Sequence, residues 1–405
     1  MARKGESWNE SEVYRDPWTL RRVRRVTTGG LYNQTPTYHT NVAFSADGEF
    51  LVFGSARAGG STLLRCHVPT GDLTQLIETV DGVGGYGPIH KQTGVAVGNG
   101  LGVDGTICLA PRSGWAVFLA GRVLRAVQIE TLEERTLVAD LGAGWVAGMP
   151  SVDPEETHVI VPLMPAHPEI VAGRRPTRPY MEHFAEGSGG AASGMRLRLL
   201  QVPLAGGEVT TVYEEEGIGS AHCPHCPADG DLLLLDRDFP PRYWGGSDGV
   251  TNRIWTLRLS TGELTELPPR DRARFQVHSV WSWDGALVLY HGRSAEGGYY
   301  IGAVDRAGRT AREYGFHGAD HYGHVSAMAG RPAIILDGNL SPDLLLWLYY
   351  DREEPRVEVV ARHGTEWNAL PGQYSHPHPL SDPTGRWISF NAAHRGRSDV
   401  FVVAV

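Results

Sequence analysis

Short apolar runs recur along this chain, and residues typical of tight turns separate them. In the first clear unit the apolar runs lie at 42–44, 51–53, 62–68 and 73–76. Asp47-Gly48 lies between the first two runs and Thr70-Gly71 between the last two. Both pairs indicate hairpin turns, because glycine readily adopts the positive φ that tight turns need. Four short antiparallel strands joined in this way are typical of one β-propeller blade.

Units of the same kind follow along the rest of the chain. They comprise a degenerate unit around 104–129, a unit from 151 to 200, and units that begin at His222, His278, His324 and His376. The third unit carries an insertion near 166–195, where a tract rich in glycine, alanine and serine is expected to form a loop. Seven units account for all 405 residues. We therefore expect an all-β fold, a single seven-bladed β-propeller domain spanning 1–405.

The last unit supplies only three clear strands and ends in the apolar run 400–405. The segment 22–28 precedes the first unit and alternates like a strand. We expect an N-terminal strand at about 21–28 to complete the last blade, at about 376–405. Closing the ring in this way would remove both exposed sheet edges.

Composition agrees with a β-fold and limits the classes of binding partner that we expect. The 51 glycines and 26 prolines are spread along the chain, which disfavours a helical protein. A formal net charge of −9 argues against nucleic acid and anionic membranes as partners, and an acidic substrate would need a locally basic site. The N-terminus lacks the apolar stretch of a signal peptide, so a cytoplasmic protein is expected, and its oligomeric state stays open. Cys223 and Cys226 form a lone C-x-x-C and are read as reduced thiols.

Histidine chemistry is the strongest functional signal. The chain has 17 histidines, and five units open with one at the equivalent point: His39, His222, His278, His324 and His376. Because the first strand of each blade lines the central axis, these side chains should converge on one funnel. In an extended strand His376 and His378 would point to the same face, and a turn could bring Gln373 to them. Such a set suits a divalent metal of intermediate hardness, although histidines bonded to backbone carbonyls are an alternative.

The segment 373–403 resembles the closing blade of the oligogalacturonate lyases. These are seven-bladed propellers that cleave galacturonate oligomers by β-elimination with a bound manganese-type ion. The resemblance extends at blade level over nearly the whole chain. It is specific in the Q-x-x-H-x-H element and in the order Arg, His, His before it. By this resemblance the metal ligands are Gln373, His376, His378 and His324, and His321 is the alternative to His324 as the fourth ligand.

The same resemblance implies that His278 is the proton-abstracting base and that Arg253 is a catalytic residue. For Arg253 an ion pair with a nearby carboxylate is the open alternative. We also expect substrate contacts from His39, His222, His321 and Arg242, with packing as the alternative for the first two. The segments 236–241 and 391–394 depart from the family pattern in loops expected to face substrate. They leave the identity of the sugar open.

Elementary chemistry agrees with the implied activity. Elimination requires removal of a proton α to a carboxylate, and a divalent metal on that carboxylate makes the proton more acidic. Arginine can hold a carboxylate bidentately, and histidine titrates in the range useful for a base. We expect a lyase that acts on short oligogalacturonides or related uronate oligosaccharides and gives an unsaturated uronate product, with Mn²⁺ as the expected ion. The alternative is a non-catalytic propeller that binds a partner; a propeller hydrolase would need a serine nucleophile elbow or paired carboxylates.

Overall fold

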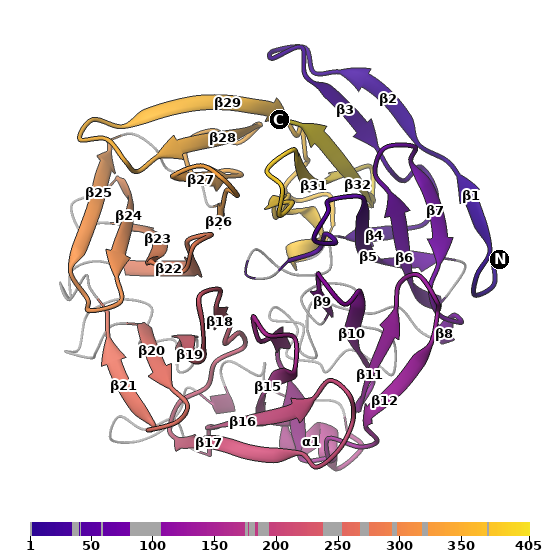
Figure 1. Ribbon diagram of the computed structural model, residues 1–405, viewed down its shortest axis with the longest axis vertical. Coiled ribbons are helices and arrows are strands. Elements are labelled where there is room, and N and C mark those ends of the chain that lie inside the picture. Colours follow the sequence, from indigo (N-terminus) through magenta and orange to yellow (C-terminus); the bar gives the residue numbers. More distant parts are fainter. Residues whose placement is uncertain are drawn as a thin grey trace.

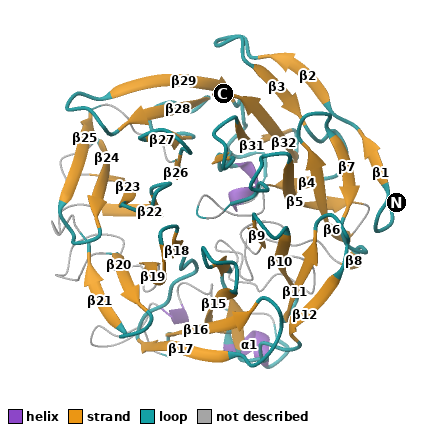
Figure 2. Ribbon diagram, in the orientation of Figure 1, coloured by secondary structure: helices purple, strands orange, loops and turns teal. Residues whose placement is uncertain are grey.

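The computed structural model describes residues 2–34, 40, 42–57, 60–81, 107–174, 177, 183–184, 194–237, 253–267, 275–293, 298–317, 323–370 and 372–405. Its named helices are short: α1 (Pro168–Val171) lies in the expected insertion, and η2 (Gly372–Ser375) is a 3-10 turn. Almost everything else that has regular structure is antiparallel strand, as Figure 2 shows. The sheets follow one another in chain order around a ring (Figure 1), which is the arrangement of a β-propeller. The expected all-β fold is confirmed.

Four sheets in the described part of the chain have four strands each, consecutive in sequence. They are β9 (Ile107–Ala110), β10 (Trp115–Ala120), β11 (Val123–Gln128) and β12 (Glu134–Val138); β18 (His225–Cys226), β19 (Asp229–Asp236), β20 (Ile254–Arg258) and β21 (Glu263–Glu266); β22 (Phe275–Trp281), β23 (Leu287–Arg293), β24 (Tyr299–Asp305) and β25 (Thr310–Phe316); and β26 (Val325–Ala327), β27 (Ala333–Leu336), β28 (Leu344–Tyr349) and β29 (Arg356–Arg362). A five-stranded sheet holds β13 (Trp145–Ala147), β14 (Ser151–Val152), β15 (His158–Pro165), β16 (Arg196–Pro203) and β17 (Thr210–Glu216).

An eleven-stranded sheet joins the two ends of the chain. Its strands are β1 (Ser7–Asn9), β2 (Glu12–Arg15), β3 (Arg22–Arg25), β4 (Tyr32–Gln34), β5 (Phe50–Arg57), β6 (Gly60–His67), β7 (Asp72–Gln75), β8 (Val80–Asp81), β30 (Leu380–Ser381), β31 (Trp387–His394) and β32 (Arg397–Ala404). β3 lies antiparallel to β32, with Val23 opposite Val403. β4 meets β32 at a single parallel pair, Tyr32 with Ser398, and is antiparallel to β5. The N-terminal segment therefore lies beside the C-terminal strand (Figure 1).

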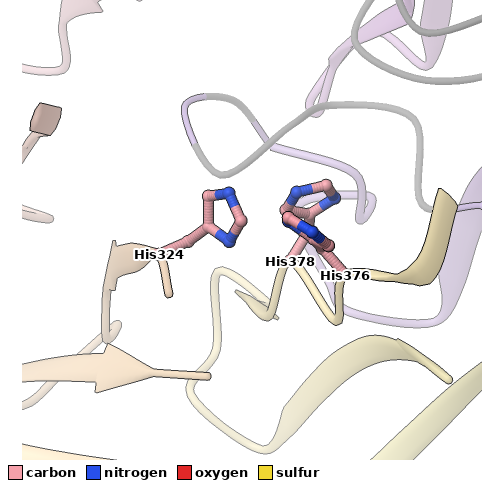
Figure 3. Close-up of side chains that lie close together, drawn as sticks. All are labelled: His324, His376 and His378. Carbon is pink, nitrogen blue, oxygen red and sulfur yellow. The ribbon is translucent and has the colours of Figure 1, made fainter. Parts of the chain in front are cut away.

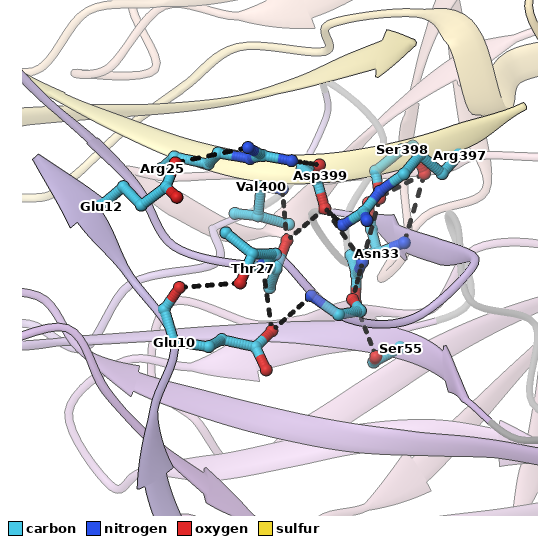
Figure 4. Close-up of polar contacts among 12 residues, drawn as sticks. Glu10, Glu12, Arg25, Thr27, Asn33, Ser55, Arg397, Ser398, Asp399 and Val400 are labelled. Atoms are coloured by element: carbon cyan, nitrogen blue, oxygen red, sulfur yellow. Dashed lines mark hydrogen bonds and ion pairs between the residues drawn. The ribbon is translucent and has the colours of Figure 1, made fainter. Parts of the chain in front are cut away.

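Polar side chains tie this seam together (Figure 4). Asp399 accepts a hydrogen bond from Arg25 at 2.7 Å and another from the Thr27 hydroxyl at 3.1 Å. The side-chain amide of Asn33 donates to the carbonyl oxygen of Ser398 at 2.9 Å. The side chains of Thr27, Asn33 and Asp399 are buried, so their hydrogen bonds replace contacts with water, whereas Arg25 stays partly exposed.

The repeated turn sequence produces a repeated structure. In the turn before β5, Gly48 has φ +70°, and the Ser45 hydroxyl donates to Asp47 at 2.6 Å. In the turn before β23, Gly285 has φ +67°, and Ser282 donates to Asp284 at 2.7 Å. Glycine is needed at these points because the left-handed region is strained for side chains with a Cβ.

Apolar side chains from neighbouring sheets meet between them and fix the sheets relative to one another. One cluster brings Ile335 and Trp347 of the β26–β29 sheet against Ile388 and Phe390 of β31, and all four are fully buried. Complete burial of such a side chain contributes about 1.5–3 kcal/mol. This packing places the short inner strand β26 between β22 and β30. None of the described helices is long and apolar enough to cross a bilayer.

Candidate metal centre

Three adjacent inner segments carry the histidines of the candidate site. His278 lies within β22, His324 directly precedes β26, and His376 and His378 lie between η2 and β30. Because β26 packs between β22 and β30, residues far apart in sequence meet at the start of these strands.

His324, His376 and His378 form a compact cluster. One ring nitrogen from each lies within 4.8 Å of the others. His324 approaches from one side, and His376 and His378 approach from the other (Figure 3). His324 and His378 are buried, whereas His376 is partly exposed. The structure thus brings together three of the four expected metal ligands. Gln373 lies in η2, and its side chain is outside the described part of the structure.

The buried carboxylate of Asp337 orients two of these histidines. Its Oδ2 is 3.0 Å from Nδ1 of His324 and accepts the backbone N–H of His378 at 3.0 Å. We assign the Nδ1–H tautomer to His324 from this contact, which leaves Nε2 for the cluster. Burial raises the pKa of the Asp337 carboxyl, and hydrogen bonds from the His324 and His378 backbones act in the opposite direction. Three imidazoles with a supporting carboxylate fit a divalent transition metal.

The backbone at His378 is left-handed, with φ +44°. The carbonyl oxygens of the flanking prolines hold it there: Pro377 accepts the N–H of Asn391 at 2.7 Å, and Pro379 accepts the Ser326 hydroxyl at 2.6 Å. The expectation that His376 and His378 share a face through an extended strand is therefore wrong, because both precede β30 in irregular backbone. Burial, followed by the charges of His324 and His376, lowers the pKa of His378 and favours the neutral imidazole that metal binding needs.

His278 lies against this cluster and also has a left-handed backbone, at φ +53°. It sits where the pairing of β22 with β23 shifts register between Val277 and Val280, so its ring is directed off the regular strand. The ring centroids of His278 and His324 are 4.4 Å apart. At that distance no sugar ring fits between the two imidazoles, so a substrate would have to lie to one side of the pair.

His291 of β23 supports His278 from behind. Its Nε2 is 2.8 Å from Nδ1 of His278, which also lies 2.9 Å from the carbonyl oxygen of Gly323. Burial lowers the pKa of His291 to about 3, and the charges of Arg253 and Arg293 act in the same direction. Sequence reasoning missed His291, whose only signal is a histidine directly after the apolar run 287–290.

Arg253 makes the ion pair that was left open as its alternative role. Its guanidinium donates to the carboxylate of Asp236, and both side chains are buried. Asp236 also accepts the hydroxyl of Ser279 at 3.3 Å, next to His278. The pair therefore links β19 to the strand that carries the candidate base.

The remaining expected residues are less informative. His222 is buried and forms an isolated parallel bridge with Met149. His39, His321 and Arg242 lie outside the described residues.

Cys223 and Cys226 are buried free thiols, and burial raises the pKa of Cys226. Trp367, which sequence reasoning did not single out, has its ring centroid 5.0 Å from that of His376.

Comparisons with known proteins agree with this architecture. No family model matches the chain, and no curated protein matches its sequence. Among solved structures, an oligogalacturonate lyase in complex with manganese is similar with a TM-score of 0.76 and 21% identity, covering 100% of this chain and 98% of that chain. An oligogalacturonate lyase from Vibrio parahaemolyticus gives a TM-score of 0.76 and 19% identity, covering 99% and 98%. The resemblance to this family is thus confirmed at the level of the fold.

A more distant structural likeness shows that the fold alone does not determine the activity. A chain of the mitotic checkpoint complex is similar with a TM-score of 0.51 and 12% identity, covering 100% of this chain and 94% of that chain. The architecture thus also occurs in a protein of a different kind, and the activity has to be argued from the site.

Proposed function

We propose that this protein is a metal-dependent lyase that cleaves short oligogalacturonides, or related uronate oligosaccharides, by β-elimination. The observation that carries the proposal is the cluster of His324, His376 and His378, oriented by Asp337 and flanked by His278. The fold likeness to an oligogalacturonate lyase solved with manganese supports it.

In this proposal His324, His376 and His378 hold the metal together with Gln373. A divalent ion there, for which we propose Mn²⁺, would supply Lewis acidity to the substrate carboxylate and so make the α-proton easier to remove. The protein's own part is to hold these imidazoles in place. The carboxylate of Asp337 orients the His324 ring, and together with the carbonyls of Pro377 and Pro379 it fixes the backbone at His378 before any ligand arrives.

His278 is our proposed general base. Its Nδ1 faces His291 and Gly323, so Nε2 is the atom that would accept the α-proton of the uronate. Arg253 is proposed as a catalytic residue that hydrogen-bonds the acidic substrate; its guanidinium stays protonated at any physiological pH, but its ion pair with Asp236 offsets its net charge. His39, His222, His321 and Arg242 remain proposed substrate contacts.

We also propose that the ring has seven blades and is closed by the N-terminal strand. The eleven-stranded sheet divides at the single Tyr32–Ser398 pair into two antiparallel stacks, β4–β7 with β1 and β8, and β30–β32 with β2 and β3. Together with the five other sheets these stacks would give seven blades. The pairing of β3 with β32 supports closure by a strand from the opposite end of the chain.

The direct test is the appearance of a conjugated unsaturated uronate, followed by ultraviolet absorbance. Saturated di- and trigalacturonate, oligoguluronate and oligomannuronate would be compared with neutral galactose oligomers, with chelator and after return of Mn²⁺. Product from at least one uronate, lost with chelator and restored by metal, is the expected result. Tight metal binding without product from any uronate would overturn the lyase proposal and favour a binding propeller.

A further inference from the structure

Trp367 borders the metal cluster on the connection that leads to it. It follows β29 and precedes η2, so the same loop delivers both Trp367 and His376. The two ring centroids are 5.0 Å apart with an interplanar angle of 61°, which places the indole and the imidazole in direct contact.

Two neighbours fix the orientation of this indole. Its Nε1–H donates to the carbonyl oxygen of Pro342 at 2.7 Å, which ties it to the loop between β27 and β28. His363 meets it edge-on, with ring centroids 5.9 Å apart at 86°. His363 is itself held, because its Nδ1 accepts the N–H of Thr365 at 3.2 Å. A ring fixed in this way loses little conformational entropy when it binds a ligand.

The position of Trp367 relative to solvent distinguishes it from the deeper residues. His324 and His378 are buried, whereas His376 and Trp367 are both partly exposed. Trp367 and His376 are therefore the members of this group that a ligand arriving from solvent can touch. A large aromatic residue that stays partly exposed beside buried polar groups is the usual composition of a small-molecule site.

We propose that Trp367 is a substrate-positioning residue whose indole packs against the C–H face of a pyranose ring. That ring belongs to the sugar next to the one whose carboxylate lies at the histidine cluster. The electron-rich face of an indole attracts the weakly positive C–H groups of a sugar and excludes carboxylates from its surface. The inference rests on the proposed function and extends it. It makes the number of sugar units in the substrate a determinant of its binding affinity, because a disaccharide reaches the indole and a monosaccharide does not.

The experiment compares Trp367→Leu and Trp367→Phe with the wild-type protein. Trp18→Phe is the control, since Trp18 is 67% exposed and lies on the connection between β2 and β3. For digalacturonate we expect KM to rise about 5- to 10-fold in Trp367→Leu with kcat nearly unchanged, and to recover in Trp367→Phe. Mn²⁺ affinity, measured by calorimetry on the protein alone, should be the same in all variants.

A second readout does not depend on turnover. Indole emission of Mn²⁺-loaded His278→Asn, which is expected to keep the metal with little turnover, should change on addition of saturated digalacturonate. This change should disappear when Trp367→Phe is added to that variant and persist when Trp18→Phe is added. An unchanged KM in Trp367→Leu, or a fluorescence response that survives Trp367→Phe, would overturn the inference. Failure of the proposed function looks different, because the wild type would then form no product from any uronate.

Discussion

Oδ2 of Asp337 lies 3.0 Å from Nδ1 of His324 and also accepts the backbone N–H of His378. One buried carboxylate thus sets the tautomer of one proposed ligand and the backbone of another. We predict that Asp337→Asn lowers Mn²⁺ affinity by about 10- to 100-fold. In asparagine one carboxylate oxygen is replaced by an NH₂ group, which cannot accept the hydrogen bonds that orient the His324 ring and the His378 backbone. Calorimetric titration of the purified variant measures this directly.

Asp382→Asn is the matched control for Asp337→Asn. Asp382 is equally buried, but it accepts the N–H groups of Thr384 and Trp387 in the turn before β31. Both variants should lose thermal stability, and only Asp337→Asn should lose metal affinity. Equal losses of affinity would mean that Asp337 acts through the fold and not through His324.

The proposed base can be removed without disturbing its unusual backbone. His278 has φ +53°, where asparagine is tolerated better than alanine, so His278→Asn separates loss of the imidazole from backbone strain. We predict that kcat falls by about two to four orders of magnitude while bound Mn²⁺ is retained. Turnover together with metal analysis of the same preparation tests this. Full activity, or loss of the metal, would assign the base elsewhere, and His321 and His222 would be examined next.

The repeat pattern was sufficient to predict much of the fold. Turns such as Asp47-Gly48 and the alternating segment 22–28 are local signals, and each depends on backbone preferences that act over a few residues. The observed strand β3 is shorter than the expected segment, because its pairing with β2 and with β32 ends at Arg25. Pairing between the chain ends is a long-range outcome that local preferences only suggest.

The convergence of His376 and His378 was predicted from their spacing, and His324 was added by the resemblance, but part of the physical reason was wrong. His376 and His378 converge through a left-handed backbone and not through the period of a strand. Asp337 and His291 were missed because they come from other parts of the chain, and only tertiary packing brings them to the cluster. Trp367 lies on the loop that carries His376, but no repeat or motif singles it out. No sequence period connects residues at such separations.

Stability should fall as the pH decreases below neutrality, and His225 should contribute to that fall. Burial lowers its pKa to about 4, while an unfolded histidine titrates near 6.5. Between these values the unfolded chain binds a proton that the native protein does not, so stability is retained above about pH 6.5 and is lost as the pH falls towards 4. The contribution is at most about 3 kcal/mol.

Denaturant unfolding of wild type and His225→Asn at several pH values between 4 and 7.5 measures this contribution. The variant loses the hydrogen bond to Ser151 and should be less stable at pH 7.5, but its stability should depend less steeply on pH. Parallel pH profiles for the two proteins would show that His225 does not titrate in this range.

Closure of the ring can be tested at Asp399, where the last strand meets the N-terminal segment. Asp399 pairs with Arg25 at 2.7 Å and accepts the hydroxyl of Thr27 at 3.1 Å (Figure 4). Both contacts come from the opposite end of the chain, so Asp399→Ala should lower the free energy of unfolding by about 2 kcal/mol, a value reduced because Arg25 remains partly solvated.

Glu12→Ala is the matched control: Glu12 pairs with the same arginine at 3.4 Å but is largely exposed, and its loss should cost less than about 0.5 kcal/mol. Denaturant titration of both variants measures the difference. If the two substitutions have the same small effect, the Asp399 contacts do not hold the ends together, and closure would depend on the β3–β32 backbone pairing, the Asn33–Ser398 hydrogen bond and the apolar contacts of Val23.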